Sequence, residues 1–131
     1  MIEVRTGFFG QLKIYINMGY TPLGIVQFKP KWYMDKNLRK YAPPLELFNA
    51  YRTGRIDIER FKLEYDLYLD SVGLFYLKET LDKLEKDGID KVVLLCFEKS
   101  DECCHRRILA KRIESDLGIT CSEIDLETES E

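Results

Sequence analysis

Residues 91–106 read KVVLLCFEKSDECCHR, and the apolar run near their start decides the fold. The segment 92–96 shows no alternation of apolar and polar side chains, and its valines favour a strand. A strand that is apolar on both faces is typical of the middle of a parallel sheet covered by helices. We therefore expect a buried strand over 92–96.

Helical patterns lie on both sides of that strand. Residues 71–88 carry leucines at helical spacing and end in a glycine, and residues 102–117 carry an apolar stripe that begins at His105. A strand between two helices in a chain of 131 residues predicts one α/β domain over 1–126. We expect a single compact domain with a mostly parallel sheet of about four strands flanked by helices. Residues 127–131 are expected to form an acidic tail.

The rest of the chain shows less regular patterns. We expect further strands over 2–5, 24–28 and 119–126. Further helices are expected to begin near Phe8, Leu45 and Asp57, the last with Asp57 as its cap. Residues 29–44 contain three of the four prolines and no clear period, so a long surface loop is expected there.

Composition and the N-terminal sequence indicate a protein of the cytoplasm. Apolar residues make up 45% of the chain, charged residues 33%, and the net charge is −3, which is a normal globular balance and excludes a uniformly basic surface for nucleic acid. The start MIEVRTGFFG lacks a signal-peptide pattern, and no apolar run approaches the roughly 18 residues of a membrane span. Cytoplasmic thiols stay mostly reduced, so clustered cysteines are expected to be catalytic, metal-binding or redox-active.

Five chemically active side chains surround the end of the expected 92–96 strand. They are Cys96, Glu98, Cys104, His105 and Arg106. Ligands of open parallel sheets bind beyond the carboxyl ends of the strands, and the start of the next helix stabilises anions and thiolates. The helical stripe turns His105 inward, toward the strand ends. We therefore predict a site here, with Cys104 as the reactive or anion-contacting thiol.

Simpler roles for the same residues stay open. His105 can be a core side chain, and Cys96 a small apolar one. Glu98 and Arg106 can form a purely structural ion pair. A zinc site lacks a CxxC pair, and a redox disulfide between Cys96 and Cys104 depends on a geometry that the spacing does not give.

A second group of cations and aromatic residues follows the expected 24–28 strand. Its predicted ligand-binding members are Lys29, Lys31, Trp32, Tyr33 and Arg39, and Arg5 of the first strand is counted with them. Aromatic rings stack on bases while nearby cations contact phosphates, so this group favours a nucleotide or nucleic acid as partner. The alternative is a solvated loop pinned by Trp32.

The segment 92–113 resembles the C-terminal signature of domain-of-unknown-function family 488. That signature is an apolar strand, Cys-aromatic-Glu, a short acidic turn, and Cys-His-Arg opening a helix. Residues 6–9, 30–32 and 41–44 are also similar to this family. The resemblance implies a single α/β domain, prokaryotic or viral and cytoplasmic, and it implies no known reaction. Gln27 departs from the cationic or small polar residue that the resemblance places near its strand end.

Three functions are compatible with these patterns. The favoured one is an enzyme acting on an anionic, nucleotide or nucleic-acid, substrate. Cys104 would supply the thiolate or anion contact, His105 the acid–base group, Arg106 the anion clamp and Glu98 the orienting or basic carboxylate. The alternatives are a non-catalytic module that binds nucleotides or nucleic acid, and a metal-binding or thiol redox protein. No pattern names a cofactor.

Overall fold

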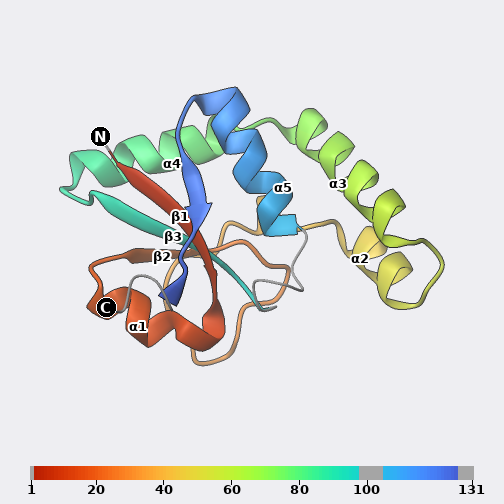
Figure 1. Cartoon of the computed structure of the whole chain (residues 1–131), viewed down its shortest axis with the longest axis horizontal. Coiled ribbons are helices and arrows are strands. Elements are labelled where there is room, and N and C mark those ends of the chain that lie inside the picture. The colour runs from red at the N-terminus through yellow and green to blue at the C-terminus, as the bar shows by residue number, and fades with distance from the viewer. Residues whose placement is uncertain (1, 98–104, 127–131) are drawn as a thin grey trace.

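The computed structural model describes residues 2–97 and 105–126 (Figure 1). Four strands form one sheet in the order β2-β3-β1-β4, and every pairing within it is parallel. The strands are β1 (Glu3–Phe8), β2 (Thr21–Gly24), β3 (Lys91–Cys96) and β4 (Cys121–Glu123). The expected α/β class, with a parallel sheet of about four strands, is confirmed.

Strand β3 lies inside the sheet, between β2 and β1, as its apolar sequence predicted. Its side chains are buried on both faces of the sheet. Val92 and Leu94 belong to one hydrophobic core, whereas Val93 and Leu95 belong to a second core on the opposite face. An uninterrupted apolar run is what two such cores require.

Helices cover both faces of the sheet (Figure 1). The helices are α1 (Leu12–Asn17), α2 (Leu45–Arg52), α3 (Ile58–Val72), α4 (Phe75–Lys86) and α5 (His105–Arg112). Helix α1 lies alone on one face, and α3, α4 and α5 lie on the other, with α2 packed against α3. Asp57 caps α3 as expected, because its carboxylate accepts a hydrogen bond from the Arg60 amide at 2.8 Å.

The chain leaves β1 and β3 in opposite directions along the sheet. Strand β1 continues through α1 to β2 and passes β3, whereas β3 continues through α5 to β4 and passes β1. Because crossovers between parallel strands are right-handed, these opposite directions put α1 and α5 on opposite faces. The carboxyl ends of β1 and β3, where Phe8 pairs with Cys96, therefore form a topological switch point of the kind at which open α/β sheets bind ligands.

The second strand differs from the expectation. It covers Thr21–Gly24, before the expected range 24–28, and it contains Pro22. Strand β2 is at the edge of the sheet, where a proline costs no ladder hydrogen bond. Ile25 and Val26 are buried although they follow the strand. The Ile25 amide still donates to the carbonyl of Leu95 on β3 at 2.9 Å, whereas the backbone of Val26 bonds to the Asn37 side chain instead.

The expected surface loop over 29–44 is more deeply buried than its composition suggested. Tyr33, Leu38 and Tyr41 are core residues, and Asn37 bridges to Gly24 at the edge of β2. The Asn37 side chain also exchanges two hydrogen bonds with the backbone of Val26. This segment therefore extends the edge of the sheet.

The helix boundaries also shift in three places. The first strand was expected over 2–5 but continues to Phe8, so α1 begins at Leu12, after a 3-10 turn over Phe9–Gln11, and not near Phe8. Helix α3 runs to Val72 and α4 begins at Phe75, because Gly73, with a φ of 68°, ends α3. The last helix was expected over 102–117, of which 102–104 lie outside the described residues. Helix α5 passes into a single π-helical turn over Ile113–Leu117 and ends at Gly118.

The final strand is shorter than the expected 119–126, and its residues pair with β1. Within 2–97 and 105–126, no helix is long and apolar enough to cross a membrane.

Candidate functional site

The start of α5 brings Arg106 onto the carboxyl end of β3. The Nη1 group of Arg106 donates a hydrogen bond to the Sγ atom of Cys96 at 2.7 Å. Both side chains are completely buried. The guanidinium also lies 6.0 Å from the ring centre of Phe8. The structure thus brings Cys96 and Arg106 together, but beneath the surface, where they hold the rim of the sheet.

Glu123, on β4, is a carboxylate that pairs with Arg106. The Nε group of Arg106 lies 2.7 Å from Glu123 Oε1, and the hydroxyl of Thr6 donates to the same oxygen at 3.5 Å. A buried guanidinium is costly unless a carboxylate compensates its charge. The sequence had suggested Glu98 as this partner, but Glu98 and Cys104 lie outside the described residues. The Arg106–Glu123 pair ties α5 to the edge strand.

A hollow of about 560 Å³ opens beside Glu123, on the side of α1. Tyr15 lines it, and its hydroxyl accepts a hydrogen bond from the amide of Phe8 at 3.3 Å. Burial raises the pKa of Tyr15, so this hydroxyl is neutral at physiological pH. None of its described lining residues is a predicted site residue.

Of the predicted catalytic residues that the structure describes, His105 lines the pocket that is described next. Its ring is buried, as the helical stripe predicted, and it packs edge-on against Tyr65 with ring centres 5.7 Å apart. The Nε2 atom lies 3.2 Å from the carbonyl oxygen of Ile25. A carbonyl can only accept, so Nε2 carries a proton, which makes Nδ1 the basic nitrogen of the neutral ring.

The pocket beside His105 is lined mainly by aromatic and aliphatic groups, and we call it the aromatic pocket. Its volume is about 150 Å³. Its described lining residues are Val26, Gln27, Phe28, Pro43, Leu45, Phe48, Asn49, Arg52, Phe97 and His105. They include one arginine and no carboxylate, which favours an anionic ligand with an apolar or aromatic part.

A groove of about 560 Å³ adjoins the aromatic pocket and shares Gln27 and Phe28 with it. Two of the predicted ligand-binding cations, Lys29 and Arg39, line this adjoining groove, together with Asp35 and Asn37. Arg39 lies 5.6 Å from the ring centre of Phe28 and donates from Nε to Gln27 Oε1 at 3.0 Å. These contacts hold Arg39 next to the pocket.

The other predicted ligand-binding residues of this segment, Lys31, Trp32 and Tyr33, are not among the described residues that line the adjoining groove. Tyr33 is a core residue whose hydroxyl donates to the carbonyl of Lys36, so it offers no ring face to a ligand. Lys29 donates to the carbonyl of Tyr33 at 2.8 Å. Trp32 is largely exposed and packs edge-on against Phe9. Lys31 is exposed.

Arg5 is not brought to the aromatic pocket. It lies in the middle of β1, and its guanidinium donates to the backbone carbonyls of Ser122 and Glu123. It also pairs with Glu3 and with the hydroxyl of Tyr20. The contacts of Arg5 thus stabilise the β1–β4 edge of the sheet.

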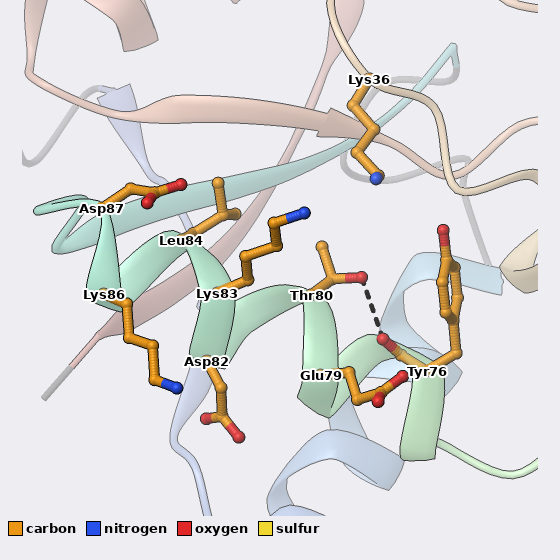
Figure 2. A pocket seen from close by; sticks show the side chains of 9 residues that line it. All are labelled: Lys36, Tyr76, Glu79, Thr80, Asp82, Lys83, Leu84, Lys86 and Asp87. Atoms are coloured by element: carbon orange, nitrogen blue, oxygen red, sulfur yellow. Dashed lines mark hydrogen bonds between the residues drawn. The ribbon is translucent and has the colours of Figure 1, made fainter.

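A further hollow, of about 640 Å³, follows α4 (Figure 2). Figure 2 shows the ammonium groups of Lys36 and Lys83 turned toward one another, while Asp82 points away from the hollow. Three lysines and three acidic residues line it, so their charges cancel. Its described lining residues include neither histidine nor cysteine, and their balanced charges give this hollow the character of a solvated helix face.

The thiols and metal ligands can be placed only in part. Cys96 and Cys121 are buried, whereas Cys103 and Cys104 fall in the range 98–104 that the structure does not describe. Among the described residues, no group of three His, Cys, Asp or Glu side chains could hold a metal ion. The disulfide between Cys96 and Cys104 that the sequence left open involves a residue outside the described ranges.

The sequence did not point to three residues of this region. Phe48 and Arg52 form a wall of the aromatic pocket from α2, and Glu123 binds Arg106 from β4. Helix α2 has no buried residue, so its apolar side chains are available to line a pocket, which only the structure shows. No local signal marked Glu123, because its partner is 17 residues away in the sequence.

Comparison with known proteins gives a family for the chain. Residues 32–113, more than half of the chain, match the family described as domain of unknown function DUF488. This range includes the wall of the aromatic pocket from α2, the strand β3, and His105. Neither the curated proteins nor the solved structures gave a match. The chain therefore belongs to the DUF488 family.

Proposed function

We propose that the protein is an enzyme acting on a small anionic substrate that binds in the aromatic pocket, with nucleotides as the favoured class. The observation that supports this proposal is the position of His105, which lines an apolar pocket together with Arg52. An apolar pocket with a few convergent polar groups is the default candidate for a substrate site. The pocket also lies near the carboxyl ends of β2 and β3, since Val26 and Phe97 line it shortly after those strands end.

His105 is the acid–base group in this proposal. The hydrogen bond from Nε2 to the Ile25 carbonyl sets the tautomer, and the contact with Tyr65 sets the plane of the ring. An imidazole has one nitrogen that can accept a proton and one that can donate a proton, so an oriented ring can move a proton during one reaction cycle.

Arg106 and Cys96 act as positioning residues rather than as substrate contacts. Arg106 follows His105 directly, and its bonds to Cys96 and Glu123 fix the start of α5 against β3 and β4. A histidine on a rigid helix start holds its ring within the narrow tolerance that proton transfer needs. The carboxylate role of Glu98 and the thiolate role of Cys104 stay predictions of the sequence.

The cations favour an anionic substrate. Arg52 lines the aromatic pocket, and Lys29 and Arg39 line the adjoining groove. Arginine guanidinium groups bind phosphate and carboxylate through paired N–H groups. A binding module without turnover would use the same cations and rings, so only a measurement of turnover separates the two functions.

The test is a turnover screen of anionic metabolites and nucleotides with the wild-type protein and three variants. His105→Asn should lower kcat by about 10²- to 10⁴-fold, the usual contribution of an acid–base group. Arg52→Gln should raise KM, and Arg55→Gln, an exposed arginine that does not line the pocket, should change neither constant. Equal turnover by His105→Asn and wild type would remove the catalytic role of His105, and binding without any turnover would leave the binding module.

A further inference from the structure

The aromatic pocket has room for only part of a metabolite. An apolar cavity of about 150 Å³ holds one benzene-sized ring, and the aromatic pocket has about that volume. Sites that enclose a whole small molecule are larger, at roughly 300–1,000 Å³. A ligand of the aromatic pocket therefore inserts one ring and leaves its remaining groups at the mouth.

Gln27 fixes the hydrogen-bonding character of the pocket wall. Its Nε2 donates to the carbonyl oxygen of Pro43 at 2.8 Å, and its Oε1 accepts from Nε of Arg39 at 3.0 Å. These two bonds hold the amide plane and determine which side carries the oxygen. A primary amide has one further N–H and one further lone pair. The amide therefore keeps one donor and one acceptor, the two groups that the C=O and N–H edge of a cyclic amide requires.

Arg52 determines where an anionic group fits. It lines the aromatic pocket from the last turn of α2, and its guanidinium lies 5.5 Å from the ring centre of Phe48. Phe48 forms part of the same wall, so the cation sits beside the space that receives the ring. A ligand whose anionic group is joined to its ring through a short linker can satisfy both at once.

We propose that the aromatic pocket binds the ring of a pyrimidine nucleotide, with the amide edge of the ring on Gln27 and the phosphate on Arg52. This inference rests on the proposed function, which requires only that the substrate be anionic, and it adds the class of ring. A purine has a second fused ring and so needs more room than the benzene-sized ring that a cavity of this volume holds. A pyrimidine nucleoside without phosphate leaves Arg52 without its anion.

The test measures binding by isothermal titration calorimetry, independently of turnover. The probes are uridine monophosphate, adenosine monophosphate, uridine and inorganic phosphate. We expect the pyrimidine monophosphate to bind at least about ten-fold more tightly than the purine monophosphate. The larger purine ring enters less deeply and thereby loses one hydrogen-bonded contact, which is worth about this factor. Arg52→Gln should weaken the monophosphate about ten-fold or more and leave uridine unchanged, whereas Gln27→Leu should weaken uridine and its monophosphate together. Arg55→Gln serves as the matched control.

Several outcomes overturn the inference. Equal or tighter binding of the purine monophosphate by the wild-type protein contradicts the ring size, and it does so without reliance on any variant. Undetectable binding of the pyrimidine monophosphate contradicts the ligand class. Turnover of a purine or a non-nucleotide anion that depends on His105 refutes this inference while the proposed function survives. Binding of the pyrimidine monophosphate without turnover refutes the enzyme and leaves the inference intact.

Discussion

The buried pair of Arg106 and Glu123 makes a prediction about stability that has an unusual asymmetry. The Arg106 side chain is 0% exposed, whereas the Glu123 side chain is 23% exposed. Glu123→Gln therefore leaves a guanidinium that water cannot reach, and removing one partner of a buried pair costs about 3–5 kcal/mol. Glutamine keeps an acceptor for the Nε group, so we expect a loss near the lower limit, about 3 kcal/mol.

Removing the other partner should cost less. Arg106→Met replaces the guanidinium with an apolar side chain of similar length, and the carboxylate of Glu123 can turn toward water because it is already partly exposed. Apolar replacement of buried ionic groups is often close to neutral, so we expect a loss of about 1 kcal/mol. The prediction is thus that removing the charge of the more exposed partner destabilises the protein more.

Urea unfolding monitored by circular dichroism measures both effects. Thermal unfolding gives a second measure, because in a domain of this size a loss of about 3 kcal/mol lowers Tm by about 10 °C. Glu79→Gln, at an exposed position of α4, is the matched control and should change the free energy of unfolding by less than about 0.5 kcal/mol. If Arg106→Met destabilises the protein as much as Glu123→Gln or more, the argument from unequal burial is refuted.

Three other predictions concern stability and pH. Burial, with a smaller effect from Glu114, raises the pKa of the Cys121 thiol from 9.0 to about 12. The thiol of the unfolded chain therefore ionises first as pH rises. The contribution of the Cys121 thiol to the free energy of unfolding should be fully present below pH 9 and fall by about 1.4 kcal/mol per pH unit toward pH 12. Cys121→Ala should remove that part of the slope in urea titrations at pH 8 to 10.5, and an unchanged slope would contradict it. Asp57→Ala should cost about 1 kcal/mol through loss of the α3 cap while Asp57→Asn costs less; equal losses in the two unfolding curves would argue against the cap. Arg112 pairs with three carboxylates that are 40–60% exposed, so Arg112→Gln should cost about 1 kcal/mol at low salt and markedly less in 1 M NaCl, a difference that salt-independent unfolding would disprove.

Much of the fold could be predicted because its strongest signals are local. The run 92–96 is apolar on both faces because two cores meet at β3. Asp57 marks the start of α3 through a hydrogen bond between residues that are only three positions apart in the sequence. The strand β2 could not be located as well, because the sequence pattern of a strand continues through Val26, whereas the last backbone hydrogen bond to β3 comes from Ile25.

The candidate site was predictable in position and less so in composition. His105 belongs to a helical stripe, so periodicity alone turned it inward toward the strand ends. Arg106, its neighbour, was expected to bind an anion near the rim, but the structure buries it completely. Periodicity gives the face of a helix, and it cannot give the depth at which the next element covers that face.

By itself, the sequence determined the central strand, the helix that follows it and the inward position of His105, because each depends on spacing within a few residues. Only the tertiary structure decided which groups meet there. Glu123 contacts Arg106 from strand β4. Arg52 lines the pocket of His105 from helix α2, which α3 and α4 separate from His105 in the sequence. Such contacts arise when separate elements pack onto one sheet, and no local pattern of side chains encodes them.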